Sequence, residues 1–163
     1  MAASLKDLMN APMRPGRLDW IGLRPERRAP LQAVDRVDVV IGGGLVGDHY
    51  TGPVDAKRMV SMIQAEHLLA VAGILGLAEV TPFMTRRNLV VSGLNLLALK
   101  GRQFTIGDAL FEFTGPCAPC SRMDENLGAG GFQAMRGHGG IITRVLRGGT
   151  IQVGDSVVVL DVA

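Results

Sequence analysis

Both cysteines of the chain lie in one short motif, Cys117-Ala-Pro-Cys120. A pair of thiols at this spacing can serve as a metal site, as a dithiol–disulfide couple, or as one activated thiolate with a neighbour. A structural zinc site needs four ligands, and His49, His67 and His138 do not have finger-like spacing, which argues against zinc. A thioredoxin-type couple normally lies in an alternating α/β context. The sequence lacks that alternation, so a redox couple is the second alternative.

A single activated thiolate fits the motif best, acting as a nucleophile, a persulfide carrier or a ligand for a soft metal. Cys120 is the better candidate, because the pattern predicts a helix that begins at or just after it and ends near Gly128. Unpaired backbone N–H groups at a helix start favour a thiolate, and Arg122 adds a positive charge close by. We therefore predict Cys120 as the reactive and metal-binding sulfur, with Cys117 as the second cysteine of the site.

Other loops carry side chains that suit a small anionic ligand. Arg86 and Asn88 follow a short helix predicted to open at Thr81 and Pro82. Arg136 and His138 lie among glycines, which let a ligand approach the backbone. We predict a cofactor-binding set near the cysteines that consists of Arg86, Asn88, Arg122, Arg136, His138 and His49.

The glycines at positions 42, 44 and 47 formally fit the Gly-x-Gly-x-x-Gly pattern of dinucleotide-binding proteins. In those proteins the glycines open a helix whose N-terminus binds the pyrophosphate. Here the chain continues DHYTGP (48–53), which does not favour a helix. We interpret the segment as a glycine-rich connection that leads to His49.

Composition limits the classes of protein to which the chain can belong. Its 163 residues are 47% hydrophobic, and its 17 basic residues against 15 acidic ones leave a net charge of +2. This charge is too small for the basic face of a nucleic-acid-binding protein. The longest apolar run, residues 68–78, is about half of the roughly 20 residues that span a membrane. The N-terminus has no secretory-type apolar stretch, so we expect a cytoplasmic protein with reduced thiols.

Short apolar runs separated by turn residues about every ten positions predict a β-rich fold. The expected strands are 37–41, 58–63, 88–91, 94–99, 103–106, 109–114, 140–146 and 157–162. We predict a mainly β protein, namely a closed or partly open β-barrel of mostly antiparallel strands with a few short helices. One helix should follow Ile63 and stop at Gly76. Four prolines suggest that residues 1–33 form an arm that packs on a domain of residues 34–163.

Five segments, taken together and in order, resemble the MOSC family, named for the C-terminal domain of molybdenum-cofactor sulfurase. They are GLVGDHY (44–50), IQAEHL (63–68), RRNLVVSG (86–93), GPCAPC (115–120), and RGHGGI (136–141) with the turn at 149–155. The resemblance covers about residue 34 to the C-terminus and suggests a stand-alone bacterial-type member. It implies a β-barrel, in agreement with the pattern of apolar runs.

The resemblance also implies a molybdenum cofactor and a role for individual residues. Cys120 matches the cysteine thought to carry sulfur or ligate molybdenum, and Arg86 and Asn88 match an arginine–asparagine pair nearby. Cys117 is an addition that would allow an internal disulfide or a persulfide relay. The aminotransferase-like domain of the sulfurase does not match any part of the sequence, so pyridoxal phosphate is not expected on this chain.

Three functions are consistent with the sequence and with this resemblance. The first is a sulfur carrier or molybdenum-cofactor-binding protein, in which Arg86, Arg136 and backbone N–H groups hold the cofactor phosphate. Its expected partner is a cysteine desulfurase or an electron-transfer protein. The second is a non-catalytic β-barrel module that binds a partner protein or a small anion. The third is a molybdenum-dependent reductase component that acts on N-hydroxylated compounds.

Overall fold

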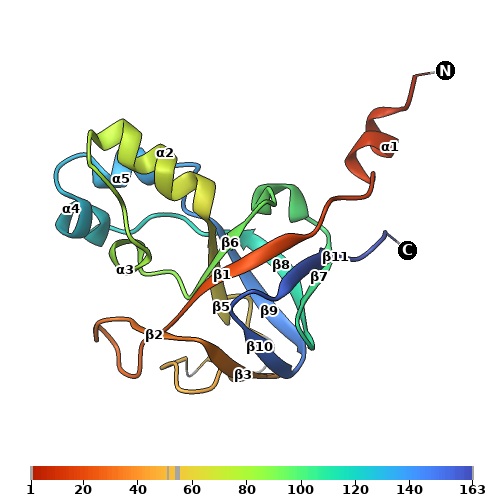
Figure 1. Ribbon diagram of the computed structural model, residues 1–163, viewed down its shortest axis with the longest axis horizontal. Coiled ribbons are helices and arrows are strands. Elements are labelled where there is room, and N and C mark those ends of the chain that lie inside the picture. The colour runs from red at the N-terminus through yellow and green to blue at the C-terminus, as the bar shows by residue number, and fades with distance from the viewer. Residues whose placement is uncertain (1, 51, 54–55, 163) are drawn as a thin grey trace.

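The computed structural model describes residues 2–50, 52–53 and 56–162, which fold around a β-barrel (Figure 1). The strands are β1 (Gly16–Leu23), β2 (Gln32–Val34), β3 (Arg36–Val40), β4 (Gly44–Leu45), β5 (Val60–Gln64), β6 (Leu89–Ser92), β7 (Gln103–Ile106), β8 (Ala109–Pro116), β9 (Ile141–Arg147), β10 (Gly149–Gln152) and β11 (Ser156–Val159). The helices are α1 (Leu5–Met9), α2 (Ala65–Leu75), α3 (Pro82–Thr85), the 3₁₀ helix η1 (Leu96–Leu99), α4 (Arg122–Leu127) and α5 (Gly131–Met135). No helix in these ranges is long and apolar enough to cross a membrane.

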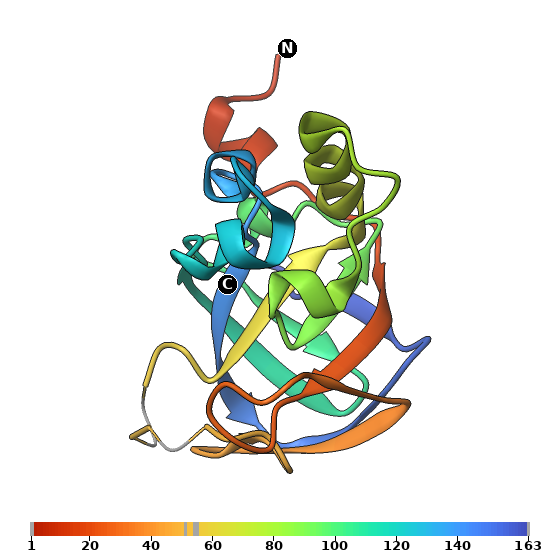
Figure 2. The same ribbon diagram turned by 90° about the vertical axis from the view of Figure 1, so that its left-hand side faces the viewer.

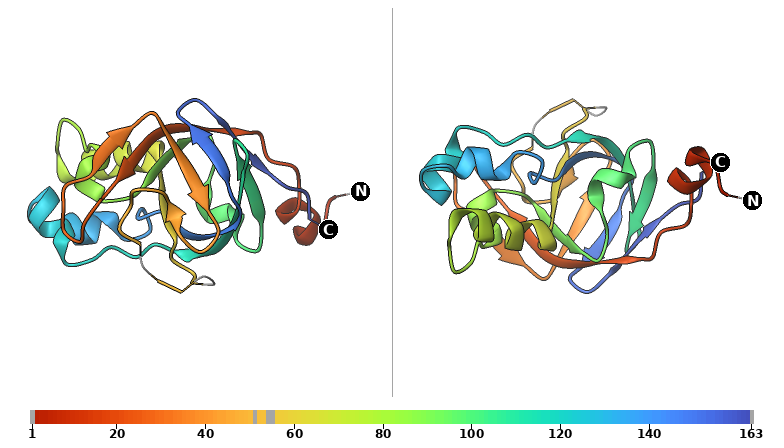
Figure 3. Two further views of the ribbon diagram at one scale, coloured as in Figure 1. Left: turned by 90° about the horizontal axis from the view of Figure 1, so that it is seen from below. Right: turned by 90° about the horizontal axis from the view of Figure 1, so that it is seen from above.

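The main sheet closes on itself. Its strand order is β11-β7-β8-β9-β5-β6-β1-β2, and β1 also pairs with β11, so the strands from β11 to β1 form a ring with β2 attached outside (Figure 3). β5 and β6 are parallel and the other described pairs are antiparallel. The parallel pair follows from the crossover through α2, since parallel neighbours need a connection longer than a hairpin. The prediction of a mostly antiparallel β-barrel is confirmed, and the barrel is closed.

Alternating side chains fill the barrel. In β3 the sequence Arg-Val-Asp-Val-Val alternates exposed and buried, so Val37 and Val39 face the core. Phe104 and Phe111 are opposite each other on β7 and β8, and their rings stack with centroids 5.8 Å apart. Burial of such apolar surface is the main favourable contribution to the stability of the fold.

The helices α2 to α5 gather at one end of the barrel (Figures 1 and 2), whereas α1 projects from the other side (Figures 1 and 3). A second apolar cluster lies between these helices and the barrel, and it includes Ile63, Val71, Met123 and Met135. Both faces of β5 are therefore covered, which explains its nearly continuous burial. The predicted helix stop is confirmed, because Gly76 ends α2 with a φ of 66°.

The N-terminal region differs from the expected arm. Residues Gly16–Leu23 form β1, which pairs with β2, β6 and β11 and closes the barrel. Pro15 and Pro25 stand just outside this strand, where their missing N–H groups interrupt no ladder bond. The prolines thus bracket a strand of the barrel itself, whereas the sequence predicted an arm that packs on the barrel.

The expected strand at residues 94–99 is instead η1. Leu96 and Leu99 are both fully buried, and a spacing of three residues places them on the same side of a 3₁₀ helix. The backbone N–H of Leu96 also donates to Oε1 of Gln64 at 3.0 Å, which fixes the start of the turn on β5. The helices α1 and α5 and the strands β2 and β4 are further elements that the apolar pattern did not predict.

Candidate functional site

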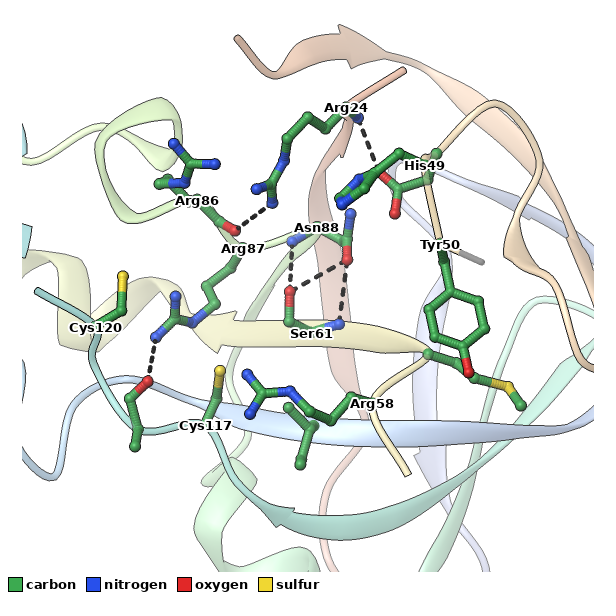
Figure 4. Close-up of a pocket in the computed structure, with 14 residues that line it drawn as sticks. Arg24, His49, Tyr50, Arg58, Ser61, Arg86, Arg87, Asn88, Cys117 and Cys120 are labelled. Atoms are coloured by element: carbon green, nitrogen blue, oxygen red, sulfur yellow. Dashed lines mark hydrogen bonds between the residues drawn. The ribbon is translucent and has the colours of Figure 1, made fainter. Parts of the chain in front are cut away.

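A cavity of about 310 Å³ opens beside the cysteine motif (Figure 4). Five parts of the chain meet around it, namely the residue after β1, the segment after β4, strand β5, the turn between α3 and β6, and the segment after β8. Its lining residues are Arg24, Asp48, His49, Tyr50, Arg58, Met59, Ser61, Arg86, Arg87, Asn88, Cys117, Ala118, Cys120 and Ile142. Its volume is at the lower end of the range for small-molecule sites.

The lining of the cavity is strongly cationic. Its described residues include four arginines, Arg24, Arg58, Arg86 and Arg87, against one carboxylate, Asp48. Oδ1 of Asp48 accepts a hydrogen bond from the backbone N–H of Arg24 at 2.8 Å, so this carboxylate is engaged in holding the chain. Among the described residues, none of the four guanidinium groups lies within 4.0 Å of a carboxylate oxygen. The described residues of the cavity therefore carry an excess of positive charge.

Arg24 and Arg86 repel each other electrostatically. Burial lowers the pKa of Arg24, while Asp48 opposes this shift and the positive charges of Arg122 and Arg87 add to it. Burial also lowers the pKa of Arg86, and Arg24 and Arg122 add to that shift. A Cys120 thiolate acts on both arginines in the opposite sense. An anion bound between these groups would relieve the repulsion.

The backbone at Arg86 is in an unusual conformation. Its φ is 62°, in the left-handed region where glycine is usual, and it caps the C-terminus of α3. The Arg86 carbonyl accepts a hydrogen bond from Nη2 of Arg24 at 3.3 Å. A side chain kept at such a position is a reason to look for function there.

Arg87 holds the cysteine segment in place. It is buried, with 6% of its surface exposed, and it donates from Nε to the Gly139 carbonyl at 2.7 Å. It also donates to the carbonyls of Thr85, at 2.9 Å, and Ala118, at 3.5 Å. In Figure 4 its side chain extends between the two cysteines. Arg87 thus ties the turn after α3 to the segments that carry Ala118 and Gly139.

The two cysteines face the same cavity but differ in exposure. Cys120 is exposed, whereas Cys117 is 5% exposed, and both are free thiols. The helix α4 begins at Arg122 and has six residues, so Cys120 precedes the first helical residue by two positions. Arg122 does not line the cavity. The sequence predicted that a helix start and Arg122 would favour a thiolate at Cys120. In the structure the positive groups that share the cavity with Cys120 are instead Arg24, Arg58, Arg86 and Arg87.

The predicted set is divided by the fold. His49, Arg86, Asn88, Cys117 and Cys120 line the cavity. Arg136 lines a separate cavity of about 290 Å³ that it shares with Cys117, and its Nη1 donates to Oε1 of Gln133. His138 contacts His67 edge to face, with ring centroids 4.9 Å apart. Arg122, Arg136 and His138 thus lie outside the main cavity.

Sequence reasoning missed several residues of the lining, of which Arg24, Arg58, Tyr50 and Ser61 are polar. Arg87 belongs to the Arg-Arg-Asn run that the sequence already indicated as a source of donors for an anion. Arg24 gave no comparable signal, because it reaches the site only as the residue that follows β1. Ser61 points inward from β5 and is found only when that strand is placed.

Comparison with known proteins agrees with this architecture. The MOSC domain family model matches residues 42–158, and the chain belongs to this family. The YuaD protein of Bacillus subtilis has a similar structure, with a TM-score of 0.80 and 20% identity, over 92% of this chain and 98% of that one. YiiM of Geobacillus stearothermophilus gives a TM-score of 0.73 and 21% identity, covering 90% of this chain and 76% of its own. YiiM of Escherichia coli gives a TM-score of 0.68 and 20% identity, covering 90% of this chain and 71% of its own. No curated protein matches the sequence.

Proposed function

We propose that the cavity binds an anionic, phosphate-bearing molybdenum cofactor and that Cys120 is its sulfur ligand. The observation that carries this proposal is the cluster of four arginines, none ion-paired among the described residues, around an exposed thiol. A soft thiolate suits molybdenum, and planar guanidinium groups suit phosphate oxygens. The family to which the chain belongs is associated with this cofactor.

The residues present fit such a group. Nε of Arg24 and Nδ1 of His49 are buried and have no hydrogen-bond partner within the described part of the chain. Unsatisfied buried polar atoms call for a ligand or an ordered water. The described residues contain no cluster of three or more His, Cys, Asp or Glu side chains that could hold a metal ion by themselves. Cys120 would therefore be the protein's single contribution to the metal, and the rest of the cofactor would be held through its anionic part.

Each lining residue has a distinct role in this proposal. Arg24, Arg58 and Arg86 bind the anionic part of the ligand, because their guanidinium groups reach the cavity and have no carboxylate partner in the part of the chain that the structure describes. Arg87 and Asn88 act indirectly, since their side chains hold neighbouring backbone and Ser61 in place. When bound, the cofactor would supply two-electron chemistry, such as the reduction of N-hydroxylated compounds.

A second candidate function is sulfur carriage, which the exposure of Cys120 favours. The Cys120 thiolate would attack the terminal sulfur of a persulfide on a cysteine desulfurase. One S–S bond then forms on Cys120, the donor S–S bond breaks, and the donor cysteine leaves as a thiolate. The arginines would stabilise the resulting anionic persulfide. This function needs no metal, although a single persulfide charge does not require all of the arginines that line the cavity.

Cofactor loading distinguishes the proposal from a non-catalytic binding module. Protein purified from a host that makes the cofactor, or loaded with it in vitro, is analysed for molybdenum and for released pterin. We expect about one molybdenum per chain, loss of the metal in Cys120→Ser, and weaker retention of the whole cofactor in Arg86→Ala. Arg136→Ala is the matched control, because Arg136 lies outside the main cavity. A Cys120→Ser protein that keeps its metal would contradict the proposal.

Sulfur carriage has its own measurement. The chain is incubated with a cysteine desulfurase and free cysteine, and its intact mass is recorded without reductant. An added mass of one sulfur atom that disappears in Cys120→Ala supports this function. If neither sulfur nor molybdenum binds, the cavity belongs to a module that recognises an anion without chemistry at the cysteine.

A further inference from the structure

The second cysteine of the motif faces the same cavity as Cys120 but is held much more firmly. The backbone N–H of Cys117 donates to the Gly140 carbonyl at 2.9 Å and so extends the β8–β9 ladder past Pro116. A methyl group at Gly139 would overlap the Cys117 carbonyl, which shows how closely the two segments approach. Cys117 is thus a fixed thiol at the wall of the cavity.

Cys120, by contrast, belongs to a segment without regular structure. Residues 117–120 lie between the end of β8 and the start of α4 and form neither strand nor helix. Arg87 is attached to this segment through the Ala118 carbonyl at 3.5 Å, the longest of its three bonds. Breaking this one bond would free residues 118–120 to bring Cys120 around the Arg87 side chain toward Cys117, with the barrel left intact.

Cys117 also lies between two cavities. It lines the arginine cavity with Cys120, and it lines the cavity of about 290 Å³ that contains Arg136 and Gly137. A buried cysteine that only fills space is usually surrounded by apolar side chains. Here the thiol borders the arginine cavity on one side and a mostly apolar cavity on the other. Positive charge on the side that it shares with Cys120 favours the thiolate form of a cysteine.

We propose that Cys117 is a resolving thiol that releases sulfur carried on Cys120. The inference rests on the sulfur-carrying branch of the proposed function. It assigns to the second cysteine a chemical step that a single cysteine cannot perform, and it makes the arginine cavity the place where the released sulfur is held.

The step balances in atoms and electrons. The Cys117 thiolate attacks the inner sulfur of the Cys120 persulfide, so a Cys117–Cys120 disulfide forms and the bond to the terminal sulfur breaks. Hydrosulfide leaves with the electron pair of that bond, and the proton of the Cys117 thiol passes to solvent. A dithiol reductant then returns both cysteines to thiols by supplying two electrons and two protons.

The charges around the cysteines suit this leaving group. Hydrosulfide would leave into a cavity lined by Arg24, Arg58, Arg86 and Arg87. Asp48, a carboxylate of the lining, is engaged with the Arg24 backbone. Opposite charge stabilises an anionic leaving group as it forms. The Cys-x-x-Cys spacing is also the one that dithiol–disulfide couples use.

The test follows the fate of one sulfur atom. Cys120 is loaded with sulfur from a desulfurase or, independently, from inorganic polysulfide, and the excess donor is removed. Sulfide release, intact mass and a non-reducing peptide map are then recorded. We expect wild-type protein to release one sulfide per loaded chain and to form a Cys117–Cys120 disulfide. In Cys117→Ser the persulfide should persist and release should be at least about tenfold slower.

The controls separate this inference from the function on which it rests. Cys117→Ala provides a second substitution at the buried position, and thermal unfolding shows that each variant is folded. If Cys120 gains no sulfur from either donor, sulfur carriage itself is wrong, and the inference fails with it. If Cys120 gains sulfur but both Cys117 variants release it as fast as wild type, or no disulfide forms in wild type, the resolving role alone is wrong.

Discussion

The Ser61 hydroxyl donates a hydrogen bond to the Asn88 amide oxygen at 3.2 Å and accepts one from the Asn88 backbone N–H at 3.1 Å. The same amide oxygen accepts from the Ser61 backbone N–H at 3.3 Å, and the Asn88 amide nitrogen donates to the Gly22 carbonyl at 3.2 Å. Asn88 thereby joins β5, the start of β6 and the end of β1. Its contribution to the cavity is to position the segments that carry Arg24 and Arg86.

Removing the side chain of Ser61 or of Asn88, and with it their mutual hydrogen bonds, should destabilise the rim of the barrel. We expect Asn88→Ala to lower the free energy of unfolding by about 2–3 kcal/mol, because buried backbone groups lose their partners. Ser61→Ala should cost about 1–2 kcal/mol for the same reason. Urea unfolding of both single variants and the double variant measures the coupling, which should be about 1 kcal/mol or more. Additive effects would mean that the two residues act independently.

The barrel could be predicted from the sequence because its signal is local. Alternating runs such as Gln103–Ile106 and Ala109–Pro116 carry a period of two, and a two-residue turn joins them into a hairpin. β1 was missed because four prolines dominate its surroundings, although the nearest two lie outside the strand. The segment that forms η1 alternates weakly, and its conformation depends on contact with Gln64, which no local pattern contains.

The site was predicted in part, for a related reason. Cys120, Arg86 and Asn88 stand in loops next to chemical motifs, so residue types alone drew attention to them. The roles of Asn88 and Arg87 depend on partners far along the chain, such as Gly22 and Gly139. Arg136 and His138 lie in a glycine-rich loop near the cysteines in space, yet the fold turns them away from the main cavity.

Arg86 offers a way to separate ligand binding from stability. A left-handed φ of 62° strains the backbone of a residue that carries a Cβ atom, whereas glycine adopts it without strain. We expect Arg86→Gly to be more stable than Arg86→Ala by about 1 kcal/mol. Both variants should lose affinity for an anionic ligand to the same extent, since both lack the guanidinium group. Chemical denaturation and binding of inorganic phosphate or molybdate measure the two effects.

Equal stability of the glycine and alanine variants would show that the backbone of Arg86 is not strained. A difference in their affinity for the anion would show that backbone geometry, and not the guanidinium group, controls binding. Arg136→Ala is a suitable control, since Arg136 lies outside the lining of this cavity.

Arg87 should tolerate no replacement, including lysine. A lysine side chain at this position would keep the positive charge but could not donate to three carbonyls in the fork geometry of a guanidinium. We expect Arg87→Lys to lower the free energy of unfolding by about 2–4 kcal/mol, because buried carbonyls lose their donors. Hydrogen exchange should become faster in residues 117–120 and around Gly139. Unchanged exchange in these two segments would mean that Arg87 does not hold them together.

The contact between His67 and His138 predicts how stability depends on pH. Burial lowers the pKa of His67 from its ordinary value of 6.5, and the neighbouring His138 adds to the shift while Glu66 opposes it. The folded protein therefore binds fewer protons than the unfolded chain as the pH falls below 6.5, so the free energy of unfolding should decrease there. At higher pH both states are neutral at His67 and the effect vanishes.

His67→Gln should flatten this dependence of the free energy of unfolding on pH, measured by urea unfolding between about pH 8 and about pH 5. His138→Gln should flatten it partly, because burial still acts on His67. Identical slopes in wild type and His67→Gln would place the pH dependence on other groups.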